Sequence, residues 1–350
     1  MTQRQRQWTI FVFRCVLCCW LFVGALLWLT AQGLLSVKPP DAPTGGATSR
    51  MVTHNMLVKR LASTQSTPTS TTKNNANNLK APSGDKLRDE VTIVTAYMNI
   101  GKFQKGEGSD TFTPDLYHVW MRIFRQIQNP LIVYLERNED IDYFHKLRED
   151  LPKNLTMTVK VSRDHLWAFG LRKRIAAIYS QPNYPKFHPN TVIPDYSCVM
   201  HAKYEFMQNA TKSNPFRTRY FAWLDIGLFR DIVTKSEPLK LHLPPNFDHT
   251  RVAYTEVYDR NRNISEHSIF HENQVWVCGA YFIAENSVMQ RWTAEYIRAT
   301  ERFLSSNLMN TDQQILYAMF SNRNSSNTIQ TYKGTGKYDP WFYLGYLCAE

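Results

Sequence analysis

An isolated carboxylate stands out in the segment RYFAWLDIGLFRDI, residues 219–232. Asp225 lies in the run 220–229, whose other members are all apolar or glycine. An ionised carboxylate in a dry interior is costly unless a cation, a metal ion or several donors meet it. The segment therefore indicates a carboxylate that holds a divalent cation, Mn or Mg, next to a diphosphate. The alternative is a strand-end aspartate in a salt bridge with Arg230 or Arg172.

A lysine on an apolar helix face is the second candidate. In DYSCVMHAKYEFMQNA, helical spacing places Lys203 one turn from Val199 and Phe206. Such a lysine either extends along its aliphatic stem to the surface or reaches a phosphate in a crevice. The same spacing puts His201 off that face, where we expect it to be exposed.

A glycine-containing loop, NIGKFQKGEGSD (99–110), follows the first apolar run of the body. Its glycines and lysines are typical of loops that contact a phosphate or a sugar, and Gly101 and Lys102 are the candidate contacts. The loop matches neither phosphate fingerprint, because Thr111 stands where GxGxxG requires Gly and no GxxxxGK[ST] occurs.

An acidic residue directly before an apolar run is a candidate catalytic base. In HENQVWVCGAYFIAE (271–285), Glu272 precedes the run and Gly279 interrupts it. A glycine inside a strand indicates either the close approach of another group or a β-bulge. We therefore place Gly279 among the candidate binding residues.

Asp312, in the segment TDQQ, is a further candidate for a role in catalysis. The alternative is structural, since Thr311 and Gln314 have the spacing of a capping box that begins a helix.

The candidate residues are carried by apolar runs that alternate with helical stretches. The expected strands are 91–97, 131–137, 157–163, 219–229, 252–258 and 275–284, and the expected helices are 114–128, 139–150, 165–180, 196–210 and 286–303. This alternation predicts an α/β fold with a mostly parallel sheet covered by helices on both faces. Ligands of such sheets bind outside the carboxyl ends of the strands, so Asp225 and the glycine loop are expected to face one crevice.

The strand around Asp225 is expected to be central. Its alternate residues are apolar on both faces, with Tyr220, Ala222, Leu224 and Ile226 on one and Phe221 and Trp223 on the other. In the helix that follows residue 285, a stripe of apolar residues at helical spacing is predicted to be core: Met289, Trp292, Tyr296, Ala299 and Phe303.

The N-terminus predicts a membrane anchor. Residues 15–37 are uncharged and would span roughly 34 Å as a helix, enough to cross a bilayer. Arg4, Arg6 and Arg14 precede this run, so residues 1–14 are expected to be a cytosolic tail. The alternative, a cleaved signal peptide, usually has a shorter apolar region.

Residues 38–90 are rich in Pro, Ser, Thr, Asn and Gly and are expected to form a disordered stem. Residues 91–350 would then form a lumenal body. Sequons at Asn154, Asn209, Asn263 and Asn324 agree with lumenal exposure. Cys198, Cys278 and Cys348 in the body allow at most one internal disulfide.

The charge distribution argues against a nucleic-acid partner. Residues 1–90 carry 11 Lys and Arg against 4 Asp and Glu, whereas residues 91–350 carry 30 against 26. The body therefore lacks the excess of basic residues expected of a nucleic-acid enzyme. No GxSxG elbow, HExxH motif or kinase set occurs either, which argues against the commonest hydrolases and kinases.

Several of these segments resemble the HtrL/YibB-like proteins, across most of residues 91–345. The segments are VTIVTAYMNIG, NPLIVYLER, MHAKYEFMQNATKSNPFRTRYFAWLDIGLFRD and TDQQIL, and the block from Lys203 to Asp231 is the most specific. Bacterial members are associated with surface-polysaccharide loci, and the family is similar to nucleotide-sugar glycosyltransferases of the GT-A type. The resemblance implies a Rossmann-like nucleotide-binding domain on a lumenal stem, the architecture of type II Golgi glycosyltransferases.

One position departs from the GT-A pattern. These enzymes usually hold their metal with Asp-x-Asp, whereas this chain has Asp225-Ile226-Gly227. The requirement for a metal therefore stays open, since Lys203 or an arginine could balance a diphosphate instead.

We therefore expect a single-pass type II membrane protein of the Golgi or another secretory membrane that transfers a sugar from a nucleotide donor to a glycan or glycoprotein. Asp225 would bind the metal–diphosphate or the ribose, Lys203 would offset phosphate charge, and Glu272 or Asp312 would act on the acceptor hydroxyl. One alternative is a lumenal glycan-binding protein or chaperone that has lost turnover. Another is a secreted hydrolase that uses paired carboxylates.

Overall fold

A computed structural model describes residues 87–106, 110–321 and 328–350. The predicted tail, anchor and most of the predicted stem lie outside these residues, as does Asn324. Among the residues described, no helix is both long enough and apolar enough to cross a bilayer. The anchor at residues 15–37 therefore stays a prediction.

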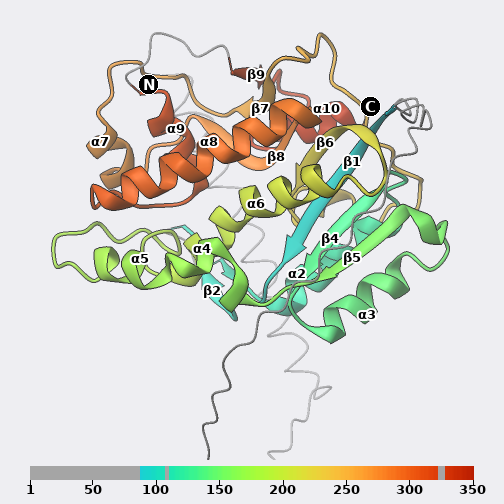
Figure 1. Ribbon diagram of the computed structural model, residues 1–350, viewed down its shortest axis with the longest axis horizontal. Coiled ribbons are helices and arrows are strands. Elements are labelled where there is room, and N and C mark those ends of the chain that lie inside the picture. The colour runs from blue at the N-terminus through green and yellow to red at the C-terminus, as the bar shows by residue number, and fades with distance from the viewer. Residues whose placement is uncertain (1–86, 107–109, 322–327) are drawn as a thin grey trace, which may run out of the picture. The chain divides into compact units, whose positions relative to one another are not determined.

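A mixed seven-stranded sheet forms the centre of the body, in the order β5-β4-β1-β6-β8-β7-β9 (Figure 1). Strands β5, β4, β1 and β6 are parallel, β9 is parallel to β7, and β8 is antiparallel to both of its neighbours. The strands are β1 (Arg88–Tyr97), β4 (Leu131–Leu135), β5 (Thr156–Lys160), β6 (Thr218–Leu224), β7 (Val252–Glu256), β8 (Val277–Glu285) and β9 (Ile329–Lys333). The predicted mostly parallel α/β fold is confirmed. Strand β1 begins at Arg88, ahead of the predicted boundary at residue 91.

Helices cover both faces of the sheet. One face packs against α4 (Trp167–Gly170), α5 (Arg172–Tyr179), α6 (Pro194–Ser213), α7 (Glu266–His271), α8 (Asn286–Ser305) and α9 (Asp312–Met319). The other packs against α2 (Pro114–Met121), the 3₁₀ turn η1 (Arg122–Arg125), α3 (Asn138–Leu147) and α10 (Tyr343–Cys348). In Figure 1, α6 and α8 lie side by side across the first face. The result is a three-layer sandwich with two separate apolar cores.

Strand β6 divides its side chains between the two cores as its sequence predicts. Tyr220, Ala222 and Leu224 pack into the core around α2 and α10, whereas Phe221 and Trp223 pack into the core around α6. The strand ends at Leu224 rather than at the predicted Phe229, because the chain turns at Asp225, whose carbonyl accepts from the Leu228 amide at 3.1 Å. This turn brings Asp225 to the end of the strand.

Helix α6 is buried on more sides than its sequence indicates. Because it packs against α8 and α4 as well as against the sheet, its expected outer face is covered too. The prediction that His201 is exposed is wrong: His201 is fully buried, with Nδ1 2.7 Å from the Tyr296 hydroxyl and Nε2 3.2 Å from Met309 Sδ. Burial lowers the pKa of His201 to about 3, so the ring is neutral.

The remaining predicted elements differ in detail. The expected helix 114–128 is α2 followed by the tighter turn η1, and the apolar stripe on α8 packs into the core as predicted. Two short strands, β2 (Phe103–Gln104) and β3 (Thr111–Phe112), pair within the glycine loop region. Cys198, Cys278 and Cys348 are buried free thiols, so the described body has no disulfide among them.

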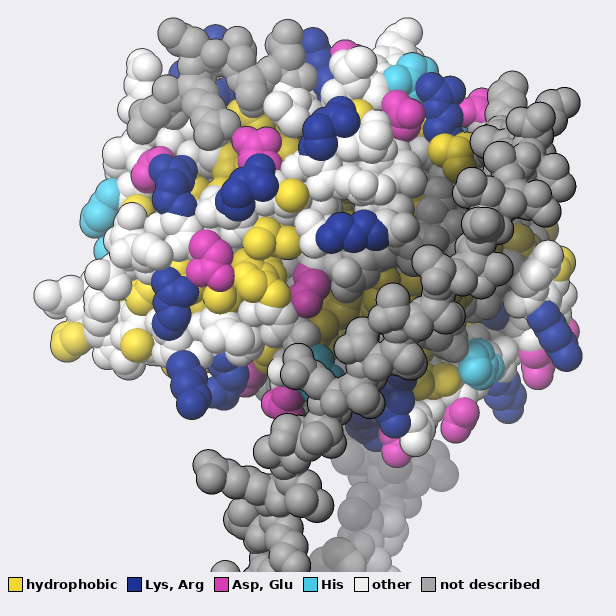
Figure 2. All heavy atoms as spheres, viewed as in Figure 1, with side chains coloured by type: hydrophobic (Ala, Val, Ile, Leu, Met, Phe, Trp, Pro, Cys, Tyr) yellow, Lys and Arg dark blue, Asp and Glu magenta, His cyan; other side chains and the backbone are white. Residues whose placement is uncertain are grey.

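On the face shown in Figure 2, Lys and Arg side chains lie among Asp and Glu side chains, and hydrophobic side chains appear between them. The described residues of this face form no continuous basic stripe. The mixed charge agrees with the near balance of residues 91–350, and the absence of a nucleic-acid partner stays a prediction.

Candidate active site

A cavity of about 570 Å³ lies at the carboxyl ends of β1 and β6. Its lining includes residues 96–101, which end β1 and begin the glycine loop. It also includes Trp223 near the end of β6 and residues 225–228, which follow that strand. Chain order reverses between these strands, since β1 is followed by β4 on one side and β6 lies on the other. Open α/β sheets bind ligands at such a switch point. The predicted common crevice for Asp225 and the glycine loop is present.

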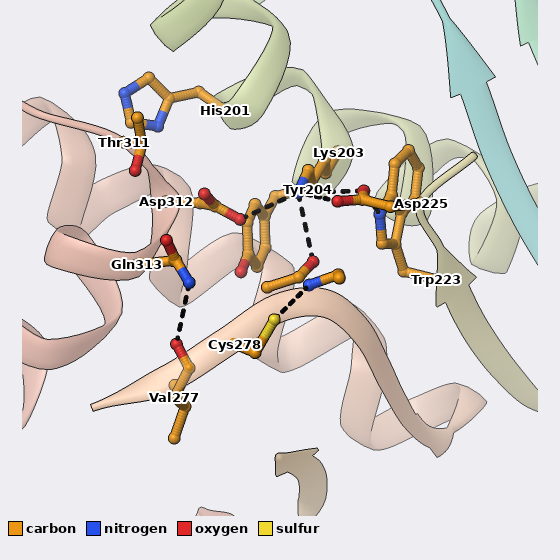
Figure 3. Close-up of polar contacts among 12 residues, drawn as sticks. His201, Lys203, Tyr204, Trp223, Asp225, Val277, Cys278, Thr311, Asp312 and Gln313 are labelled. Atoms are coloured by element: carbon orange, nitrogen blue, oxygen red, sulfur yellow. Dashed lines mark hydrogen bonds and ion pairs between the residues drawn. The ribbon is translucent and has the colours of Figure 1, made fainter. Parts of the chain in front are cut away.

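Lys203 is held at this cavity by two carboxylates (Figure 3). Its Nζ lies 3.1 Å from Asp225 Oδ1 and 3.2 Å from Asp312 Oδ2, and it donates to the Gly279 carbonyl at 3.2 Å. An ammonium group has three donors, and these three acceptors use them. Of the two alternatives for Lys203, extension to the surface is wrong, because its side chain is 4% exposed.

Asp225 faces the cavity more openly than Asp312 does. The side chain of Asp225 is 32% exposed and that of Asp312 only 3%. Trp223 Nε1 donates to Asp225 Oδ1 at 2.6 Å, which fixes the carboxylate at the strand end. The partner of Asp225 is therefore Lys203, and neither arginine of the alternative interpretation, Arg230 or Arg172, pairs with it; Arg172 pairs with Asp195 instead.

The cluster of Lys203, Asp225 and Asp312 carries one more negative than positive charge. Burial raises the pKa of Asp225 above its ordinary value and Asp312 adds to this, although Lys203 and Trp223 act in the opposite direction. Burial alone would lower the pKa of Lys203, but the two carboxylates outweigh it and the pKa of Lys203 is raised. Lys203 therefore stays charged, and Asp225 is a stronger base than an exposed aspartate.

Gly279 makes room for the carboxylate of Asp312. A Cβ atom at this position would lie 2.1 Å from Asp312 Oδ2. The pairing of β8 with β7 also shifts here, from Phe282 directly to Cys278, so the strand bulges at Gly279. Both predicted reasons for this glycine apply, and together they turn its carbonyl to Lys203.

The start of α9 differs from the predicted capping box. Thr311 is the N-cap residue, but its hydroxyl donates to the Gln314 side-chain carbonyl at 2.8 Å and caps no backbone amide. Asp312 occupies the first helical position, where the positive end of the helix dipole favours a carboxylate. The helix therefore presents Asp312 to Lys203.

The missing second acid of Asp225-Ile226-Gly227 has a steric explanation. A Cβ atom at Gly227 would lie 2.9 Å from Trp120 Cε3, so this position has no space for a carboxylate side chain. Asp312 brings a second carboxylate to the cavity from a distant segment of the chain.

Two cations on aromatic rings complete the lining. Arg230 lies 4.7 Å from the Phe342 ring centroid and 5.8 Å from that of Trp120, and Lys105 Nζ lies 5.5 Å from that of Phe112. Such stacking orients a cation without neutralising it. The sequence indicated Lys105 only as one lysine of the glycine loop, where Lys102 was the candidate contact, and it did not assign Arg230 to ligand binding.

The other predicted residues divide between the cavity and its surroundings. Gly101 lines the cavity with a φ of +79°, a value that favours glycine, whereas Lys102 is exposed and outside the lining. Glu272 is exposed and lines a neighbouring groove instead. The geometry therefore brings Lys203, Asp225, Asp312, Gly279 and Gly101 together and leaves Lys102 and Glu272 apart.

Comparison with known families gives one assignment. The sequence model of the HtrL_YibB family, described as bacterial proteins of unknown function, matches residues 89–343. The chain belongs to the HtrL_YibB family. No curated protein matches the chain. The HtrL_YibB description assigns no activity, so the chemistry has to be argued from the cavity.

The residues present do not fit a resident Mn or Mg ion. Asp225 already accepts from Trp223 and Lys203, and Lys203 also takes Asp312 Oδ2. Among the described residues, no group of three or more His, Cys, Asp or Glu side chains could hold a metal ion. In this member of the HtrL_YibB family, a lysine ammonium lies between the carboxylates.

Proposed function

We propose that this chain is a glycosyltransferase that takes a sugar from a nucleoside-diphosphate donor. The observation that carries the proposal is a carboxylate of raised basicity in the same cavity as two aromatic-stacked cations, at the switch point of an α/β sheet. The cavity volume of about 570 Å³ also lies in the range of small-molecule sites. The related GT-A fold expected from the sequence is part of this proposal.

In the proposed reaction, Asp225 accepts the proton of the acceptor hydroxyl. The acceptor oxygen forms a bond to the anomeric carbon of the donor sugar, and the bond from that carbon to the phosphate oxygen breaks. The nucleoside diphosphate leaves with the electron pair. Asp225 is the base rather than Asp312 because it is the more exposed to the cavity.

Arg230 and Lys105 would offset the charge of the leaving diphosphate. Lys203 has no donor left for a phosphate, so its role is to position Asp225 and Asp312. Fixed cations stabilise developing charge without reorganisation. The proposed reaction therefore has no step that needs a metal ion.

The direct test incubates the full chain with a panel of nucleoside-diphosphate sugars and oligosaccharide acceptors, with and without EDTA. One donor should release its nucleoside diphosphate, and EDTA should not abolish the release. Arg230→Ala should raise the donor KM by roughly tenfold, since a charge-assisted contact contributes about 1.5–3 kcal/mol. Arg291→Ala, an exposed change on α8, is the matched control. Absence of turnover with every donor would contradict the proposal.

A second function, glycan binding without turnover, is favoured by two observations. Lys203 already neutralises part of the charge of both carboxylates, and the GT-A acidic pair is absent at Asp225-Ile226-Gly227. Calorimetry distinguishes the two, because a binding protein would take up glycans without consuming any nucleotide sugar.

We also propose that the body faces the secretory lumen, held by the anchor at residues 15–37. The sequon residues Asn154, Asn209 and Asn263 are exposed. In cells that attach N-glycans, treatment with an endoglycosidase should lower the apparent mass, and Asn154→Gln should remove part of that shift. A chain whose mass does not change would contradict the lumenal placement.

A further inference from the structure

A second hollow lies beside the cavity and is named here the side groove. It has a volume of about 660 Å³ and is lined by Tyr258, Asn261, Glu272, Gln274 and Trp341, among others. Its walls come from the turn after β7, the end of α7 and the segment before α10. These segments are far apart in the sequence, so no single sequence motif predicts the groove.

The side groove adjoins the cavity. Asn273, Val275 and Trp341 line both hollows. Asn273 has a φ of +53°, and its side-chain carbonyl accepts from the amides of Asn190 and Asn310 at 3.1 Å each. The wall shared by the two hollows is therefore held by a polar network, and the two hollows lie next to each other.

Aromatic rings stand at the open side of the groove. Tyr258 is 55% exposed, and its ring centroid lies 5.9 Å from that of Trp341 in an edge-to-face arrangement. A large aromatic side chain left open to solvent beside polar groups is typical of a binding surface. The C–H faces of sugar rings pack on such aromatic faces.

The groove differs from the cavity in charge. The cavity lining has three basic residues, Lys105, Lys203 and Arg230, beside four aspartates, whereas the described lining of the groove contains Asp259 and Glu272 and neither Lys nor Arg. The nearby Arg260 is directed elsewhere, since its guanidinium stacks on Trp276 and Phe320. Carboxylates and amides form hydrogen bonds to hydroxyl groups. Asp259 pairs with Lys333, so the repulsion of anions in the groove rests on Glu272.

We propose that the side groove binds the acceptor as a neutral oligosaccharide. Its sugar rings pack on Tyr258 and Trp341, and its hydroxyls form hydrogen bonds with Asn261, Glu272 and Gln274. The inference rests on the proposed function in one respect: the terminal sugar of the acceptor reaches into the cavity, where Asp225 takes its proton. Glu272, expected from sequence to be a catalytic base, is in this account an acceptor-binding residue.

The experiment measures binding of neutral oligosaccharides of one to four sugars to the full chain by calorimetry, without donor. Affinity should increase with length, and Tyr258→Ala should weaken it by about tenfold, equal to the contribution of one aromatic contact. Glu272→Gln should weaken binding while retaining the shape of the side chain. Met157→Ala, which removes another exposed side chain at the far end of the sheet on β5, is the control.

Three results would overturn the inference: no binding of any neutral oligosaccharide, equal binding by Tyr258→Ala, or tighter binding of acidic oligosaccharides. Donor hydrolysis by the wild-type chain is measured separately. If neutral oligosaccharides bind through Tyr258 and no donor is hydrolysed, the proposed binding site in the side groove is supported and the proposed transfer reaction is contradicted. If a donor is hydrolysed and Tyr258→Ala binds oligosaccharides as the wild-type chain does, only the proposed binding site in the side groove is contradicted.

Discussion

Lys203 and Arg148 are both almost fully buried cations, 3% and 5% exposed, but their surroundings differ. Lys203 contacts two carboxylates at the edge of a cavity. The Arg148 guanidinium donates to the carbonyls of Phe124 and Ile127 at 2.7 and 2.8 Å, to that of Asn129 at 3.3 Å, and to the Thr156 hydroxyl at 2.5 Å. Arg148 lines neither the cavity nor the side groove.

The difference shows which buried charge indicates a function. Burial lowers the pKa of Arg148 to about 10, and its donors satisfy carbonyls between η1 and β4 that would otherwise be unpaired. Its role is completed within the fold. The cluster around Lys203 leaves a net negative charge beside open space, which a ligand can use.

Lys203→Met should produce the largest effect on stability. It leaves the carboxylates of Asp225 and Asp312 without their cation, which should cost roughly 4 kcal/mol of unfolding free energy at neutral pH. Lys203 lowers the pKa of Asp225 against the effect of burial, so without Lys203 that pKa rises further above its unfolded value, and the loss should shrink as the pH falls and Asp225 takes up a proton. Denaturant unfolding across pH measures this, with Lys212→Met on the exposed side of α6 as control. A loss of stability that is independent of pH would contradict this prediction, because it would mean that Lys203, like Arg148, stabilises the fold without affecting the protonation of carboxylates.

Arg148→Met should cost roughly 3 kcal/mol, because buried carbonyls lose their donor. No carboxylate accepts from Arg148 in the described residues, so this loss should be nearly constant between about pH 5 and pH 8. The same unfolding series measures it, with the exposed Arg125→Met as control. Turnover per folded molecule should stay unchanged; a selective loss of turnover would give Arg148 a part in the site.

His201 is a buried basic group of a third kind. Lys203 is paired with carboxylates and Arg148 donates to carbonyls, whereas His201 is buried in its neutral form. Its folded pKa of about 3 lies below the ordinary 6.5, so the unfolded chain binds more protons and stability falls as the pH drops below 6.5. At about pH 4.5 the loss should approach roughly 2.7 kcal/mol. His201→Gln should lower stability at pH 7 but lack this part of the acid dependence, whereas the exposed His165→Gln should retain it. If the unfolding free energy of His201→Gln fell with pH as steeply as that of the wild-type chain, protonation of another group would cause the acid dependence.

The sequence predicted the elements that have one dominant local pattern. The alternation in β6 assigned its side chains to the correct faces, and the stripe on α8 was correctly taken as core. The isolated position of Asp225 in an apolar run also placed it correctly at the crevice. The predictions for β6 and α8 rest on apolar residues that repeat at a fixed spacing, and the prediction for Asp225 rests on its contrast with the apolar residues on either side; each is a pattern within one segment.

The remainder depends on segments that meet only in the folded chain. His201 was misplaced because α8 covers the side of α6 that a two-sided helix would expose to water. The two carboxylate partners of Lys203 are 22 and 109 positions away, so no local spacing in the sequence predicts these contacts. Gly227 is required by Trp120, which belongs to a different element. The antiparallel direction of β8 likewise follows from its connections rather than from its composition.

The central claim is that Asp225 serves a ligand and not the fold. Asp225→Asn leaves Lys203 paired with Asp312, so stability should change by about 1 kcal/mol or less, while loss of the base should lower the rate by roughly 100-fold or more.

The decisive measurement compares sugar transfer and thermal unfolding for the wild-type chain, Asp225→Asn and the exposed Asp231→Asn. The account predicts that only Asp225→Asn loses transfer and that all three proteins unfold at nearly the same temperature. An Asp225→Asn protein that unfolds far earlier, or that transfers sugar at the wild-type rate, would contradict it.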